Sequence, residues 1–151
     1  MIALLLMPPL LAAVVAALVR PYRPWVGWVS VLAAGVSLVV SVAAAVAVAT
    51  AVPTLEPEAG RIDALSALLA VCISFVMLLA SALGPGLADE RADPSARRFR
   101  IFINAFSVTM LAAVTVQNVA LMWVAIEATT ITSAMVIPLR RTKASIEASW
   151  K

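Results

Sequence analysis

The chain has 151 residues, of which 64% are apolar and 13% are charged, and its mean hydropathy is +1.05. This composition excludes an ordinary soluble globular protein and indicates an all-α integral membrane protein. A net charge of +3 would suit a nucleic-acid ligand in a soluble protein. Arg and Lys stand almost entirely between apolar runs, however, so we interpret them as signals of membrane orientation and expect no nucleic-acid partner.

The chain is poor in residues that ligate metals. It has no His and a single cysteine, Cys72, which lies inside an apolar run. Structural zinc, His-ligated haem and cysteine-ligated iron–sulfur clusters need more ligands than these. We therefore expect no cofactor in this chain and regard Cys72 as a small apolar filler. No hydrolytic constellation or phosphate-binding loop is present, so we expect a non-catalytic membrane protein.

The first apolar run, about residues 2–19, predicts a first membrane span. A signal peptide carries basic residues before its apolar segment, whereas Arg20 and Arg23 follow this one. Pro8 and Pro9 lie inside the run. Because proline removes a backbone donor, they predict a bend or a late start of the helix.

The remaining apolar runs complete the predicted topology. Residues 101–139 are too many for one crossing, and the amides Gln117 and Asn118 provide the natural break. We expect a single transmembrane domain with five spans, about 2–19, 25–52, 64–84, 101–116 and 119–139. Residues 140–151 resemble the start of a further helix, with Ser145 as a possible cap.

The loop charges predict the orientation. Acidic residues gather in the loop after the second span, and cations gather after the first, third and fifth. Those cations are Arg20 and Arg23; Arg91, Arg97, Arg98 and Arg100; and Arg140, Arg141 and Lys143. Alternate loops share a side, so this pattern predicts a multi-pass cell-membrane protein with its N-terminus outside. Trp25 and Trp28 would then anchor the second span at the cytoplasmic interface.

Glu127 is the residue that most needs an explanation. It stands near the middle of the fifth span, about 12 Å from the outer surface at 1.5 Å per residue. An ionised group there costs about 2.5–3.5 kcal/mol on insertion scales. Burial disfavours the charged form, so this carboxyl can take up and release protons. The alternative is a permanently protonated Glu that holds two helices together by donating a hydrogen bond.

Other polar residues fall beside Glu127 or in other spans. Thr130, Ser133 and Thr129 share one flank of the helix with it and could form a polar relay. Ser and Thr in membrane helices usually bond to their own backbone, however. We interpret Asn104 as packing between helices and Asp63 as the cap of the third span.

The segments around Glu127 and at the C-terminal end also resemble a known family. LMWVAIEATT, residues 121–130, and RTKASIEASWK, residues 141–151, are similar to the antiporter-like membrane subunits of complex I and its relatives. The nearest likeness is the F-type subunit of the hydrogenase-4 and formate hydrogenlyase group. The segment RIDALSAL, residues 61–68, and Asn118 are weaker matches.

This resemblance implies a proton-translocating membrane arm. The family's fifth-helix glutamate, matched by Glu127, pairs with a lysine on a later helix. Lys151 matches a residue at the start of the sixth helix and is a second candidate site. Members carry about fourteen helices, so the likeness implies the N-terminal part of such a subunit. Its partners would be the bilayer, protons, and the other membrane and peripheral subunits of a respiratory or hydrogenase complex.

Two other functions compete with this interpretation. A small proton-coupled exporter would exchange protons against a lipophilic cation, and we would expect an aromatic cage near its acid. Only Trp123 lies within one turn of Glu127. A non-transporting membrane scaffold would use Glu127 for packing alone.

The expected orientation can be tested by labelling single cysteines. With Cys72 replaced by Ser, a cysteine introduced in 53–61 should react with an impermeant reagent from outside the cell. A cysteine in 85–98 should react only after permeabilisation. Labelling of the 85–98 site in intact cells would contradict the assignment.

Overall fold

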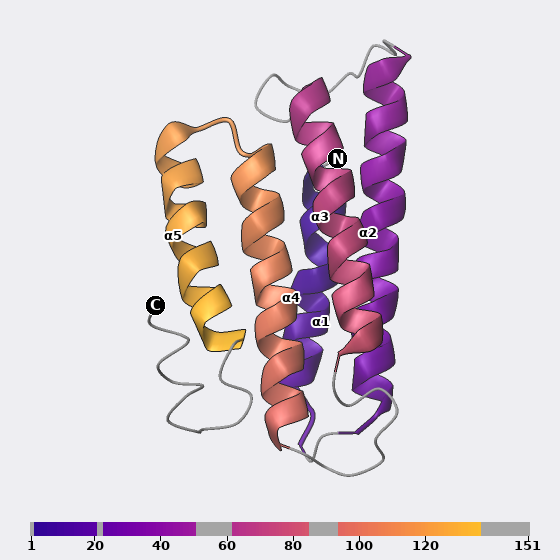
Figure 1. The fold of residues 1–151 in the computed structure, drawn as a ribbon, viewed down its shortest axis with the longest axis vertical. Helices are drawn as coiled ribbons and strands as arrows, with labels where there is room; N and C mark the ends of the chain where they lie inside the picture. The colour runs from indigo at the N-terminus through magenta and orange to yellow at the C-terminus, as the bar shows by residue number, and fades with distance from the viewer. Residues whose placement is uncertain (1, 21–22, 51–61, 85–93, 137–151) are drawn as a thin grey trace.

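The computed structural model describes residues 2–20, 23–50, 62–84 and 94–136. They form the helices α1 (Ile2–Leu18), α2 (Trp25–Ala49), α3 (Ala64–Leu83), α4 (Pro94–Thr115) and α5 (Val119–Val136). Successive helices run in opposite directions (Figure 1). Within the described residues, α2 to α5 are long and apolar enough to cross a membrane, and α1 is a shorter apolar helix. The predicted all-α polytopic bundle is confirmed.

The helices are arranged as a closed group of four with a fifth on its outside. Each of α1 and α3 packs against both α2 and α4, whereas α5 packs mainly against α4. Figure 1 shows α5 at the edge of the molecule, beyond α4. The first four helices therefore cover one another's inner faces, and α5 has only one substantial neighbour.

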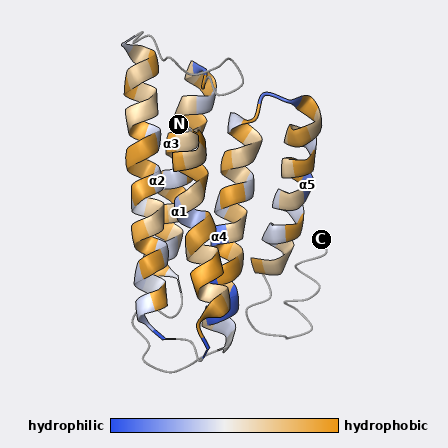
Figure 2. Cartoon of the chain, turned by 180° about the vertical axis from the view of Figure 1, so that it is seen from behind, coloured by the Kyte–Doolittle hydropathy of each residue, from blue (hydrophilic) through white to orange (hydrophobic). Residues whose placement is uncertain are grey.

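The interior of this group is built from small residues. The buried positions of α2 are mainly Ala, Ser and Gly, whereas its large residues Leu32, Val39 and Val46 are exposed. Lipid tails are as apolar as Leu, so helices in a membrane gain little by hiding large apolar side chains from lipid. Small residues instead let two backbones approach closely. Hydrophilic residues gather mostly at the ends of the bundle (Figure 2).

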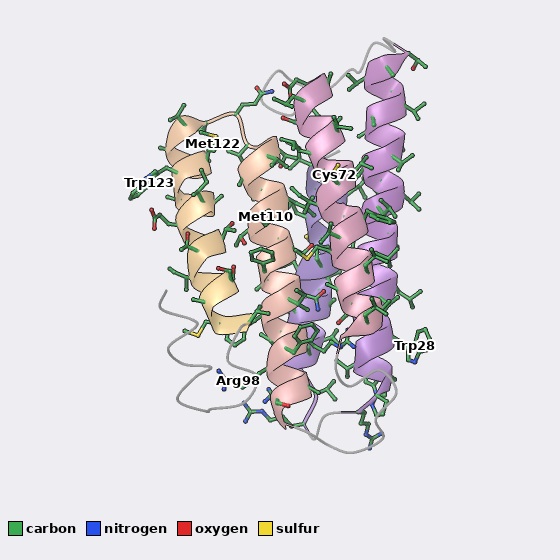
Figure 3. The ribbon with its side chains drawn as sticks, viewed as in Figure 1. Trp28, Cys72, Arg98, Met110, Met122 and Trp123 are labelled. Carbon is green, nitrogen blue, oxygen red and sulfur yellow. The ribbon has the colours of Figure 1, made fainter. Side chains whose placement is uncertain are left out.

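Cys72 does not belong to that interior. Its side chain is exposed on α3 (Figure 3). The buried residues of α3 include Ala70 and Ser74, and Cys72 is two positions from each, which is about 200° around the helix. Cys72, interpreted as a small apolar filler, thus lies on the outer surface of the described helices and not among their buried residues.

The prolines in α1 leave a carbonyl that α2 satisfies. Pro9 has no N–H, so the carbonyl of Leu5, four residues earlier, loses its usual helical partner. The buried hydroxyl of Ser37 donates to the Leu5 carbonyl at 3.2 Å. Ser41 then donates to the Ser37 carbonyl at 2.7 Å and lies 2.9 Å from the hydroxyl of Ser74 on α3. A short ladder of serines thus joins α1, α2 and α3.

Ser37→Ala should destabilise the bundle by about 1 kcal/mol, because it leaves the Leu5 carbonyl without its donor. Pro9→Ala restores the N–H that the carbonyl lacks, so Ser37→Ala should cost clearly less in that background. Reversible unfolding in detergent of the four chains of this double-mutant cycle measures the coupling. Equal costs in both backgrounds would show that Ser37 does not compensate for Pro9.

The first turns of α4 hold α1 and α3 through arginines. Arg97 donates to the carbonyls of Ala16 and Ala17 at 3.1 and 2.5 Å. Arg100, which is fully buried, donates to those of Ser81 and Gly84 at 2.6 and 3.3 Å. These carbonyls lie at the C-terminal ends of α1 and α3, where helices lack donors and favour cations.

The placement of these arginines corrects the sequence analysis. Arg97, Arg98 and Arg100 were expected in the loop before a span near residue 101, but they belong to α4, which begins at Pro94. Hydropathy identifies only the apolar part of a helix. The basic first turns of α4 are also helical, because carbonyls of two neighbouring helices accept hydrogen bonds from their arginines. Arg20 and Arg23 flank the α1–α2 connection at the same end of the bundle.

Asp63 caps α3, as predicted. One of its carboxylate oxygens accepts a hydrogen bond from the backbone N–H of Ser66 at 3.0 Å. Hydrogen bonds from the side chain and the backbone N–H of Ser66 lower the pKa of Asp63 below its ordinary value of 3.8. The charged carboxylate is therefore the form that the folded helix end prefers.

The cap predicts a dependence of stability on pH. A carboxyl whose pKa is lower in the folded chain stabilises fully above pH 3.8, and the benefit is lost as the pH falls below that value. Asp63→Asn keeps a capping oxygen but cannot titrate, so its unfolding midpoint should change less than that of the wild type between about pH 6 and pH 3. Thermal unfolding in detergent measures both chains, and identical acid sensitivity would contradict the assigned role.

Candidate functional site on the fifth helix

The helix that carries Glu127 starts at a side-chain cap. The side-chain oxygen of Asn118 accepts hydrogen bonds from the backbone N–H groups of Ala120 and Leu121 at 3.0 and 3.2 Å. The break between α4 and α5 thus lies at residues 116–118, around the amide pair that the sequence analysis marked. Glu127 follows halfway along the 18-residue helix.

Glu127 lies on the side of α5 that the described chain leaves open. None of the residues of α5 is buried, and the side chain of Glu127 is exposed. Its neighbours one turn away on this side, Trp123, Val124, Thr130 and Ile131, are exposed as well. Trp123 projects from α5 away from the other helices (Figure 3). We call these five residues the open face of α5.

No cation of α4 or α5 lies near Glu127 in sequence. α5 has no Lys or Arg, and the cations of α4 are the three arginines in its first turns. Among the residues that the structure describes, no group of three or more His, Cys, Asp or Glu side chains could hold a metal ion. Glu127 is therefore the single ionisable group in the middle part of the α4–α5 pair.

The hydroxyls near Glu127 bond to their own helix. Thr130 donates to the carbonyl of Ile126 at 3.0 Å, Ser133 to that of Thr130 at 2.8 Å, and Thr129 to that of Ala125 at 2.8 Å. This confirms the expected back-bonding. Each hydroxyl uses its one proton in this hydrogen bond, but its oxygen can still accept a hydrogen bond from a water or from a protonated carboxyl.

The polar flank of α5 extends over two different environments. Thr130 shares the open face with Glu127, whereas Thr129 and Ser133 are half-buried. On the opposite side, the hydroxyl of Thr132 lies 3.3 Å from the hydroxyl of Thr109 on α4. Hydroxyl groups thus surround much of the helix between its open face and its contact with α4.

Two other candidates are placed differently. Asn104 is buried within the four-helix group, where its side-chain nitrogen donates to the hydroxyl of Ser30 at 2.8 Å and to the carbonyl of Arg100 at 2.6 Å. These bonds support its interpretation as packing. Lys151 and the whole of 141–151 lie outside the described residues.

The polar contacts between the helices that support this site could not be predicted from the sequence. The cross-helix roles of Ser37, Arg97 and Arg100 depend on which carbonyls lie opposite. One signal was present, because Ser30, Ser37 and Ser41 fall on one face of α2 at helical spacing. That spacing predicts a packed polar face but does not identify its partners.

Comparison of the chain with protein-family models, with curated proteins and with solved structures finds no match in any of the three. The class of molecule that the fold defines is a polytopic helical membrane protein.

Proposed function

We propose that the chain is the N-terminal part of a proton-translocating, antiporter-like membrane subunit. The subunit would belong to a respiratory NADH dehydrogenase-like or hydrogenase complex in the cell membrane, and Glu127 would be its proton-carrying group. The observation that carries the proposal is the position of Glu127 at the centre of an open face, halfway along a membrane-length helix.

The open face of α5 is poorly suited to contact with hydrocarbon. A carboxyl at mid-membrane depth is costly in hydrocarbon, and such groups almost always face protein or a water-filled cavity. The four-helix group does not reach Glu127, because α5 meets it mainly through α4 on the other side. The open face is therefore a surface for further protein of the same membrane arm, in agreement with the family resemblance.

The chemistry of the Glu127 carboxyl depends on its hydroxyl neighbours. Between two protein surfaces, a carboxyl beside hydroxyl oxygens can hold water and exchange a proton with it. Thr130 supplies such an oxygen on the same face, and Ser133 supplies one on the flank. The resemblance adds a lysine from a later helix as the partner that would control the charge of Glu127 (a role for which this chain offers no cation on α5).

The competing functions receive less support. An exporter for lipophilic cations needs several aromatic faces around its acid, and Trp123 is the only aromatic residue of α5. A packing role for Glu127 predicts a good hydrogen-bond acceptor opposite it, and none of the described helices provides one. These alternatives differ from the proposal in how Glu127 variants behave.

The test is Glu127→Gln in the complete complex. Gln keeps the shape and much of the hydrogen bonding but cannot titrate, so proton translocation should be abolished or strongly reduced while subunit content stays normal. Glu127→Asp should lie between, because its carboxyl is withdrawn by one methylene. Translocation per electron transferred and subunit content are measured on the same preparations.

The matched control makes the same carboxyl-to-amide change at the cap. Asp63→Asn removes an acid outside the membrane-length part of α3 and should leave translocation unchanged. If Glu127→Gln pumps and assembles normally whereas Glu127→Leu fails to assemble, Glu127 is a packing donor and the proposal is wrong.

A further inference from the structure

We infer that Thr132 is the positioning residue for Glu127, through its contact with Thr109 of α4. The inference rests on the proposed function, since it concerns the direction in which the proton-carrying group points. The hydroxyls of Thr109 and Thr132 lie 3.3 Å apart and join α4 to α5. Both residues are half-buried.

Small residues make much of the remaining interface of α5, and Val136 packs against the buried cluster of Met77, Phe99 and Ile103. The half-buried residues of α5 include Ala125, Ala128 and Ala134, and none of its side chains is fully buried. Small residues allow a close approach but do not interdigitate deeply. Apolar contact is also non-directional, whereas a hydrogen bond depends on angle as well as distance. The threonine pair therefore supplies the directional contact.

The two hydroxyls of the pair share two protons among several possible hydrogen bonds. Thr132 has carbonyls of its own helix within reach, Ala128 at 2.9 Å and Thr129 at 3.0 Å, and Thr109 has that of Phe106 at 3.0 Å. Each hydroxyl has one proton and two acceptor positions. The threonine that accepts keeps its bond to its own backbone, whereas the one that donates across the interface gives up its local bond, so the contact between helices costs one helix one local bond.

The geometry connects this contact to Glu127. Thr132 and Glu127 are five residues apart, which places them about 140° apart around the helix. While Thr132 meets Thr109, Glu127 must point away from α4, as its exposure shows. Thr129 is also half-buried and stands three residues from Thr132. Pairing of Thr109 with Thr129 instead would turn the helix, and Glu127 with it, by about 60°.

The experiment uses the assembled complex and compares Thr132→Val, Thr132→Ser and Glu127→Gln. Loss of the Thr132 hydroxyl should lower translocation per electron by about three-fold, the size expected for an average hydrogen bond between membrane helices. It should also shift the pH profile of translocation, because Glu127 then faces different surroundings. Glu127 is the only titratable group of α5, and α4 contributes only arginines, which stay charged. Thr132→Ser keeps the hydroxyl and should restore both readouts.

Two further variants separate positioning from general damage. Thr109→Val removes the same contact from α4, so it should reproduce Thr132→Val, and the double variant should be no worse than either. It also serves as the test if Thr132→Val lowers subunit content. Thr115→Val is the matched control, because Thr115 donates to the Leu111 carbonyl of its own helix at 2.7 Å, and its loss should leave the pH profile unchanged.

The outcomes distinguish the two proposals. If Glu127→Gln translocates normally, the proposed function fails. If Glu127→Gln is inactive but Thr132→Val and Thr109→Val keep the wild-type rate and pH profile, the positioning inference alone is wrong. Additive effects of the two threonine variants, or a Ser variant as impaired as Val, would also overturn it.

Discussion

The structure depends on one constraint, which is that a polar group without water must find its partner inside the protein. The contacts that join helices in this chain obey it repeatedly. The carbonyl freed by Pro9 accepts from Ser37, and the carbonyl-rich ends of α1 and α3 accept from Arg97 and Arg100. Packing in lipid is weakly directional, so these few hydrogen bonds add direction to the contacts between helices.

The same constraint divides the molecule into two parts. Several polar groups inside the four-helix group have partners from neighbouring helices, as the pairs Asn104–Ser30 and Ser41–Ser74 illustrate. On α5, the hydroxyls rely mainly on their own backbone, and the carboxyl of Glu127 points away from the group. Among the described residues, the carboxyl of Glu127 has no hydrogen-bond partner on another helix, and in the proposed function further protein would supply it. For this reason the open face supports a role in a larger membrane arm.

The arrangement also gives the proposed proton-carrying group a rigid support. α4 is held at one end by arginine contacts to two helices, and α5 follows it after the short break at 116–118. Glu127 is thereby carried on a helix of defined direction rather than on a loop. Precise placement matters for proton transfer, which requires a donor and an acceptor at hydrogen-bond distance.

The sequence by itself determined the class of the protein, the five helices of the described residues and the position of Glu127 along its helix. These follow from local properties, because hydropathy and length select membrane helices and Asn118 or Asp63 can cap a helix without distant partners. Only the tertiary structure decided that α4 begins at Pro94, that Cys72 lies outside, and that Glu127 and Thr129 face different surroundings. Each of these depends on what another helix presents opposite the residue, and spacing along one helix carries no information about its neighbour.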